Sequence, residues 1–185
     1  MAEWGQREAK REAARRVRAR RSRFSKPETL QRRIAEEARA AKGITRLVGW
    51  AHEKGFTVVF GPKKKDAIFY ELGRITISSR NSLGSQLIGL IHECGHLLVT
   101  RDECYTRRFG RGWPHAERTA KRSRATLVHR IQILEEEIEA WNRGEAIANE
   151  LKIRVQPELW TQVRTICLRS YAVWASGRAP MGRVQ

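Results

Sequence analysis

Residues 90–98, LIHECGHLL, decide the fold, because they place three ionisable side chains inside an apolar run. On a helix, positions four apart share a face, with Cβ atoms about 5–6 Å apart. His92 and His96 can therefore offer two imidazole nitrogens to one metal ion. Glu93 lies about 100° further round the helix, close enough to hydrogen-bond a water on that ion. The pattern predicts a zinc site with Glu93 as the general base.

The flanking residues predict that this motif lies on a buried helix. Apolar side chains recur at helical spacing from Leu83 to Leu98, and Asn81-Ser82 supplies a helix start, so we expect a helix ending near Thr100. The alternative is a pair of core histidines beside a chance glutamate. Three polar groups buried without partners would be costly, and we therefore favour the zinc site.

The composition indicates one basic domain of ordinary size. The chain has 185 residues and 41% hydrophobic residues, enough for a core. Its 37 Lys and Arg against 20 Asp and Glu give a net charge of +17, which predicts attraction to polyanions such as nucleic acid. The alternative is a charge that serves only solubility.

Cysteine usage and hydropathy bound the location of the protein. Three cysteines without a Cys-x-x-Cys pair indicate a reducing compartment. No secretory signal and no apolar run of about 18 residues is present, so we expect no membrane partner. The expectation is a cytoplasmic protein, or one packaged in a particle.

Changes in charge and the positions of Gly and Pro divide the chain into three parts. Residues 1–26 are rich in Arg and Ala and nearly free of large apolar side chains, which predicts a basic flexible arm. This arm could contact nucleic acid or be an inert charged tail. Residues 27–176 form the expected metallopeptidase-like domain, and the Gly- and Pro-punctuated residues 177–185 are expected to be a mobile tail.

The periodicity predicts helices on both sides of the motif. A helix beginning at Pro27 is expected to stop at Gly43, and a second to stop at Gly55. After the motif, residues 101–120 look irregular. Two C-terminal helices are expected, one from about residue 118 to 155 and one carrying residues 159–174.

A short sheet is expected between the second helix and the motif. Three β-rich segments lie at residues 56–60, 67–70 and 74–78. The third alternates strictly, which indicates a half-buried or edge strand, and as the last strand before the helix it could bind an extended peptide by β-augmentation. The sequence thus predicts an α+β fold with a small three-stranded sheet.

A catalytic zinc site needs a third protein ligand and one open position. The acidic run at residues 135–139 lies on a predicted helix whose apolar face a helical wheel locates. Glu137 falls on the extended side of that face and is the first candidate. Glu135 lies on the opposite flank, whereas Glu136 and Glu139 point further out and are expected to be solvated.

Other residues remain as alternatives for the ligand and for the oxyanion donor. His115, which follows Gly-Trp-Pro, is the second candidate for the third ligand, and His129 and Asp102 are further ones. Hydrolysis of a peptide bond also needs a hydrogen-bond donor for the developing oxyanion. Tyr105, His115 and Tyr171 are candidates that the sequence does not rank.

Two motifs together resemble the zincin domain of gluzincin metallopeptidases, most of all the ImmA/IrrE-type peptidases of phages and mobile elements. In that family, strands lead into a His-Glu-x-x-His helix, and a later helix carries Glu-x-x-Ala, here residues 137–140. The resemblance covers about residues 44–150. It implies a zincin-like minidomain in which His92, His96 and Glu137 hold Zn²⁺. A long basic insertion between the motifs departs from the family, as does Trp141, which stands where Asn is common.

SprT-like proteases, which cut proteins crosslinked to DNA, offer a second resemblance. They share the motif helix and carry a third histidine in a Gly-containing loop, where His115 would match. Both resemblances imply a zinc-dependent endopeptidase acting on a protein substrate, which could be DNA-associated. The alternative is a nucleic-acid-binding or phage-particle-associated protein with a structural or vestigial zinc site, favoured by the Arg-rich arm.

Overall fold

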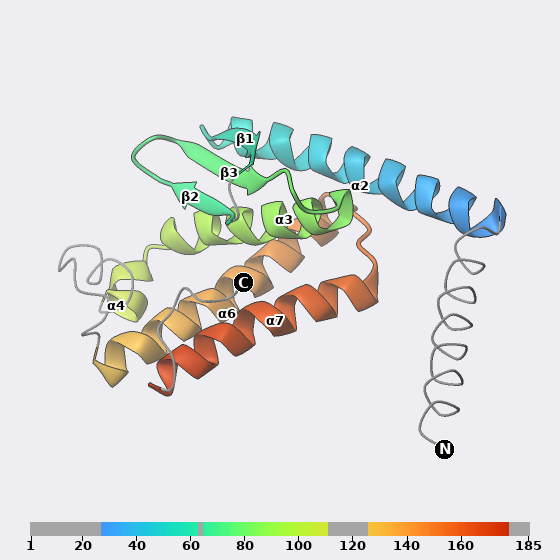
Figure 1. Ribbon diagram of the computed structural model, residues 1–185. Helices are drawn as coiled ribbons and strands as arrows, with labels where there is room; N and C mark the ends of the chain where they lie inside the picture. The colour runs from blue at the N-terminus through green and yellow to red at the C-terminus, as the bar shows by residue number, and fades with distance from the viewer. Residues whose placement is uncertain (1–26, 63–64, 111–125, 178–185) are drawn as a thin grey trace, which may run out of the picture. The chain divides into compact units, whose positions relative to one another are not determined.

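The computed structural model describes residues 27–62, 65–110 and 126–177 (Figure 1). The predicted arm at residues 1–26 and all but the first residue of the predicted tail lie outside this part, as does His115. The chain divides into two compact units, one reaching Arg39 and one beginning at Ala40. All the elements discussed below belong to the second unit, except the first half of the first helix.

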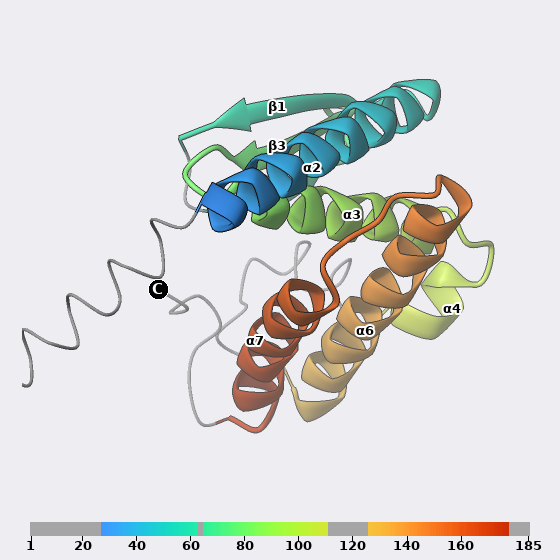
Figure 2. The same cartoon turned by 90° about the vertical axis from the view of Figure 1, so that its right-hand side faces the viewer.

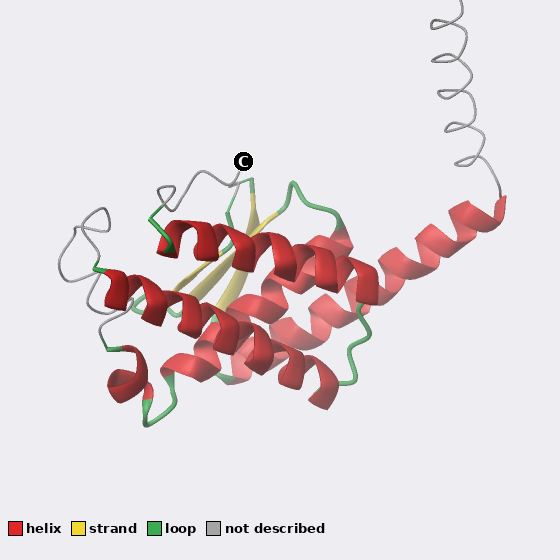
Figure 3. Ribbon diagram, turned by 90° about the horizontal axis from the view of Figure 1, so that it is seen from below, coloured by secondary structure: helices red, strands yellow, loops and turns green. Residues whose placement is uncertain are grey.

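The described residues form an α+β fold, as predicted (Figure 3). In chain order the elements are α2 (Pro27–Glu53), β1 (Thr57–Gly61), β2 (Ala67–Phe69), β3 (Arg74–Ser78), α3 (Leu83–Thr100), α4 (Tyr105–Phe109), α6 (Leu127–Glu150) and α7 (Pro157–Ala175). Within the second unit, the sheet lies on one side of α3, and α6 and α7 lie on the other (Figures 1 and 2). This arrangement buries α3 between two layers.

Helix α2 runs without a break through Gly43, so the prediction of two separate helices is wrong. A Cβ at Gly43 would lie 3.0 Å from Ile153 Cγ2 and 3.1 Å from Leu87 Cδ1. The glycine therefore serves close packing against the core rather than a helix end. The second predicted stop holds, because Gly55 follows the helix with a φ of +80° that favours glycine.

The third predicted strand, β3, is the central strand of the sheet and not an edge. The strand order is β1-β3-β2, with β1 parallel and β2 antiparallel to β3. Ile75 and Ile77 are fully buried, and Thr76 and Ser78 on the other face are buried as well. The alternation of apolar and polar residues was a poor guide here, because the polar residues Thr76 and Ser78 are small and are buried on the second face of the strand. A peptide could add to the sheet only beside β1 or β2, since both sides of β3 are paired.

The C-terminal half differs from the prediction at its helix ends. Residues expected to be irregular contain the short helix α4. Helix α6 begins after Thr126, whose side chain accepts a hydrogen bond from the His129 amide, and ends five residues before the predicted boundary. Helix α7 begins at Pro157. Backbone nitrogens in the first turn of a helix have no partner within the helix, so the missing N–H of proline costs no hydrogen bond there.

The motif helix α3 matches its prediction and is held against α6 by two glycines. Ser82 caps its first turn by accepting a hydrogen bond from the Ser85 amide. A Cβ at Gly95 would overlap the Ala140 carbonyl oxygen, and one at Gly144 would lie 2.6 Å from the Ile91 carbonyl oxygen. The two helix backbones therefore approach each other more closely than side chains would allow.

This close approach predicts opposite effects of one substitution at two helical glycines. Gly95→Ala should destabilise the protein by about 1–3 kcal/mol or more, because the added methyl group forces α3 and α6 apart. Gly49→Ala is the matched control: nothing lies within 4 Å of its Cβ position, so it should be neutral or stabilise the helix by up to about 1 kcal/mol. Urea unfolding of the metal-free proteins measures both. Equal effects at the two positions would contradict the close packing.

Candidate metal centre

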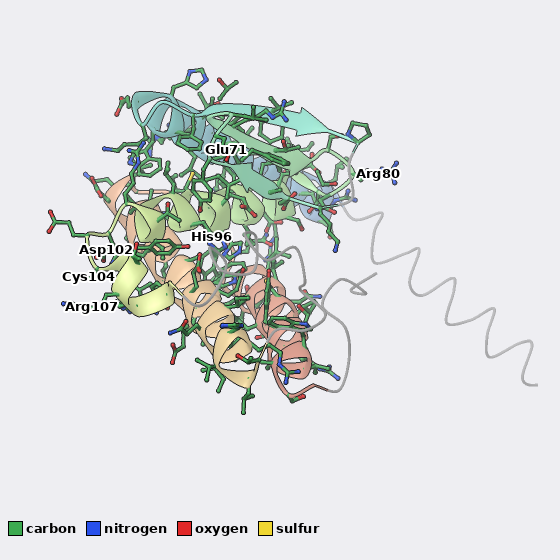
Figure 4. The ribbon with its side chains drawn as sticks, turned by 90° about the vertical axis from the view of Figure 1, so that its left-hand side faces the viewer. Glu71, Arg80, His96, Asp102, Cys104 and Arg107 are labelled. Carbon is green, nitrogen blue, oxygen red and sulfur yellow. The ribbon has the colours of Figure 1, made fainter. Side chains whose placement is uncertain are left out.

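Helix α3 presents His92 and His96 side by side on the face that meets α6. Both rings are buried, with 8% of each residue exposed. Their Nε2 atoms lie 3.2 Å apart and the ring centroids 4.6 Å apart. Figure 4 shows His96 on the side of α3 that faces away from the sheet. The two nitrogens converge on one point, as the four-residue spacing predicted.

Glu137 reaches the same point from α6. Its carboxylate oxygens lie 3.2 Å from His92 Nε2 and 3.5 Å from His96 Nε2. One ligand atom from each of the three residues lies within 4.8 Å of the others, and together they form the group able to hold a metal ion among the described residues. Two imidazoles and one carboxylate are a donor set that suits Zn²⁺ and leaves a fourth position open.

The three groups hold a proton between them when no ion is bound. Burial alone would raise the pKa of Glu137, but the neighbouring imidazoles hold it well below its usual range. Burial opposes protonation of His96, yet the Glu137 carboxylate raises its pKa to about 9. Burial lowers the pKa of His92. A cation bound at this point would take the place of that proton.

Glu93 lies on the same helix between the two histidines and is 7% exposed. Burial raises its pKa to about 8, while His96 opposes the shift and Asp66 adds to it. The Asp66 carboxylate packs where Gly89 lacks a Cβ, one turn before Glu93, and accepts a 2.7 Å hydrogen bond from the Ser78 amide. A carboxylate with a pKa near neutrality can both take up and release a proton at physiological pH.

Aromatic rings cover one side of the histidine pair. The indole of Trp141 stacks on the His92 ring at 4.4 Å and 22°, and Trp160 meets Trp141 edge-on at 5.2 Å. Both contacts come from the helices α6 and α7. The tryptophan that departs from the family resemblance therefore lies against a candidate ligand and limits how its ring can turn.

Helix α7 adds two further side chains to the site. Tyr171 lies close enough to Glu137 to interact with it: burial first, and then that carboxylate, raise the Tyr171 pKa well above its usual value. Burial raises the pKa of Cys167 to about 12. Both groups thus stay protonated near neutral pH. The sequence predicted Tyr171 as a candidate oxyanion donor. It did not identify Cys167, which lies on a helix that was predicted only to pack in the core.

Glu136 is buried, which contradicts the prediction that it is solvated. Only 2% of the residue is exposed, and its Oε1 accepts a 3.1 Å hydrogen bond from the Tyr105 hydroxyl. The helical wheel considered α6 alone and could not include α4, which covers this flank. Glu139 is partly exposed and pairs with Arg143 four residues on, as expected.

The remaining candidates lie elsewhere. Asp102 accepts hydrogen bonds from Arg143 at 2.7 Å and from the Cys104 amide at 2.8 Å, in the turn before α4 (Figure 4). The Cys104 amide and Arg143 lower its pKa. His129 is in the first turns of α6 and is not part of the three-residue group. Tyr105 contacts Glu136 rather than the open side of the histidine pair.

Comparison of the chain with protein-family models, with curated proteins and with solved structures finds no match. In the part of the chain that the structure describes, none of the helices combines the length and the hydropathy needed to cross a membrane. What the protein does must therefore be inferred from the side chains that meet at His92 and His96.

The burial of Glu93 predicts that the metal-free protein loses stability as the pH rises. The pKa of this group is about 8 in the folded state against 4.5 as its ordinary value, so its contribution is complete below about pH 4.5 and lost as the pH rises through about 8. Between pH 5 and 6.5 the slope approaches about 1.4 kcal/mol per pH unit.

Unfolding of the chelator-treated protein at several pH values measures this slope. Glu93→Gln cannot titrate and should reduce the slope in that window, whereas Glu135→Gln, exposed on α6, should leave it unchanged. Parallel curves for the parent and Glu93→Gln would show that Glu93 does not have a raised pKa.

Proposed function

We propose that the protein is a zinc-dependent endopeptidase with a zincin-like arrangement, in which His92, His96 and Glu137 hold Zn²⁺. The observation that carries the proposal is the buried Glu137 carboxylate, which comes from another helix to within 3.5 Å of both Nε2 atoms. A carboxylate in an apolar core is costly unless it is paired. A donor set of this kind, beside a second carboxyl group, is typical of hydrolytic zinc sites.

In this mechanism each residue of the site has a separate task. Bound Zn²⁺ would polarise the scissile carbonyl and lower the pKa of a bound water to about 7. Glu93 would accept a proton from a water at the open position and return it to the leaving amine. Its burial, which raises its pKa in the metal-free protein, favours the uptake of a proton by this carboxylate. The stack of Trp141 on His92 holds the ring in place and keeps water away from its covered face.

Tyr171 is the oxyanion donor that we favour. Its hydroxyl is protonated and interacts with Glu137, so it lies near the position of an ion that Glu137 would hold. A donor that is already fixed before the reaction stabilises developing negative charge without reorganisation. Tyr105 is less suited, because its hydroxyl lies against Glu136, on the Nδ1 side of the His96 ring, rather than beside Glu137.

The distribution of charge favours a substrate associated with nucleic acid. Residues 1–26 hold ten basic and three acidic residues, whereas the described residues together hold 18 basic and 16 acidic ones. The metal centre thus belongs to a nearly neutral part of the chain. We propose that the arm tethers the enzyme to protein substrates on DNA, in the cytoplasm or in a phage particle. In the second candidate function, nucleic-acid binding is the activity and the zinc site is structural.

Substitution of Glu93 separates metal binding from turnover. Glu93→Gln should keep one Zn²⁺ per chain and cleave unstructured protein substrates about 10²–10⁴-fold more slowly, because the proton acceptor is lost. His96→Ala should lose the metal, and Glu139→Gln is the matched carboxamide control on α6. Metal analysis and a gel-based cleavage assay measure both properties. A Glu93→Gln protein as fast as the parent would remove the base assignment, and a zinc-loaded parent inactive on every substrate would favour the structural site.

Removal of the arm tests the polyanion interaction. Deletion of residues 1–26 takes away ten basic residues, so affinity for duplex DNA should fall and its dependence on salt should flatten. A full-length variant with those ten residues changed to Gln should behave like the deletion, since charge and not length is responsible. Zinc content reports that the domain remains folded. Unchanged DNA affinity at low salt would show that the arm does not contribute to DNA binding.

A further inference from the structure

The buried carboxylate of Glu136 has no role in the mechanism above. Glu136 and Glu137 are adjacent on α6, so their side chains leave the helix about 100° apart. Both residues are only 2% exposed. A third buried carboxyl group adds a large desolvation cost to a region that already holds Glu93 and Glu137. The contacts of Glu136 must therefore account for its position.

One oxygen of Glu136 lies between two groups from different helices. Glu136 Oε1 accepts a 3.1 Å hydrogen bond from the Tyr105 hydroxyl of α4. The same oxygen is 3.9 Å from Nδ1 of His96 on α3, an ion-pair distance rather than a hydrogen bond. The opposite nitrogen of that ring, Nε2, is 3.5 Å from Glu137. The two glutamates thus face the two nitrogens of one imidazole.

This arrangement matters because a neutral imidazole carries a single N–H. A histidine that binds a metal through Nε2 must hold its proton on Nδ1. A carboxylate facing Nδ1 favours that tautomer and orients the ring, and loss of such a partner commonly weakens metal binding 10–100-fold. The hydroxyl of Tyr105 in turn limits the movement of the carboxylate.

We propose that Glu136 is a positioning residue for the metal centre, which holds His96 in the tautomer and orientation that present Nε2 to Zn²⁺, with Tyr105 holding Glu136 in place. The inference rests on the metal site of the proposed function and extends it to α4. His92 is held differently: its Nδ1 is buried without a hydrogen-bond partner among the described residues, and its ring is stacked on Trp141. Of the two histidines, His96 is the one that faces Glu136.

A purely structural role for Glu136 is the competing interpretation. In that case the carboxylate would serve to anchor α4 to α6 through Tyr105, and zinc affinity would follow fold stability. The two interpretations differ for Tyr105→Phe, which breaks the anchor but leaves the carboxylate facing His96. They also differ in the tautomer of His96, which an anchor alone does not set.

The test measures zinc affinity by chelator competition for the parent, Glu136→Gln, Tyr105→Phe and Glu135→Gln, a matched control on the exposed side of α6. We expect affinity 10–100-fold weaker in Glu136→Gln, a smaller loss in Tyr105→Phe and no change in the control. Melting of the metal-free proteins identifies any variant that fails to fold. Nitrogen-15 NMR of the zinc-loaded parent should show a protonated Nδ1 on His96, and this signal should shift or broaden in Glu136→Gln.

The outcomes separate this inference from the peptidase proposal. If Glu136→Gln binds zinc within twofold of the parent and its His96 signal is unchanged, the positioning role is wrong while peptidase activity is unaffected. Losses that are equal in Glu136→Gln and Tyr105→Phe, and proportional to their loss of melting temperature, would also overturn it. If the parent binds zinc and shows the expected differences but cleaves no protein, the positioning role stands and the peptidase function fails. A parent that binds no zinc overturns both.

Discussion

The contact between the backbones of α3 and α6 sets the geometry of everything at the metal centre. Gly95 lies between the two histidines in sequence, and it packs on the carbonyl of Ala140, three residues after Glu137. The crossing point is therefore within one helical turn of the candidate ligands on both helices. A wider crossing would leave the carboxylate too far from the imidazoles to share an ion, since zinc bonds are only about 2 Å long. The glycine inside the motif thus matters as much as its histidines.

The same crossing explains how a core can tolerate so many ionisable groups. His92, His96 and Glu137 are buried together, and the opposite charges of His96 and Glu137 offset part of the desolvation cost. Glu93 adds a carboxyl group whose burial favours the proton-bound form. A divalent cation suits such a cluster better than protons do, because one ion can interact with all of these groups at once. Burial raises the free-energy cost of these charged groups in the absence of a cation, and it also strengthens their electrostatic interaction with one.

Much of this centre could be predicted from the sequence, because its signals are local. The motif helix and the positions of the strands follow from spacing and composition, and the wheel placed Glu137 toward the core. The failures concern contacts between distant segments. Gly43 lies inside a helix because Leu87 and Ile153 pack on it, and Glu136 is buried because α4 covers its flank. No local pattern contains that information. The alternative ligand His115 lies outside the described residues.

The excess of basic residues and the buried ionisable groups at His92 and His96 lie in different parts of this chain. The described residues are close to neutral, while residues 1–26 and 111–125 together carry 15 basic and four acidic residues. At physiological ionic strength a charge acts over only about 8 Å, so the nearly neutral part gains little from a polyanion by itself. A polyanion would therefore be attracted by the basic segments, whereas the buried groups at His92 and His96 are close enough together to hold a metal ion. The second basic segment lies between α4 and α6 in sequence, the two helices that Tyr105 and Glu136 connect. From α4 the described contacts lead to His96 in two steps, the Tyr105–Glu136 hydrogen bond and the 3.9 Å approach of Glu136 Oε1 to His96 Nδ1.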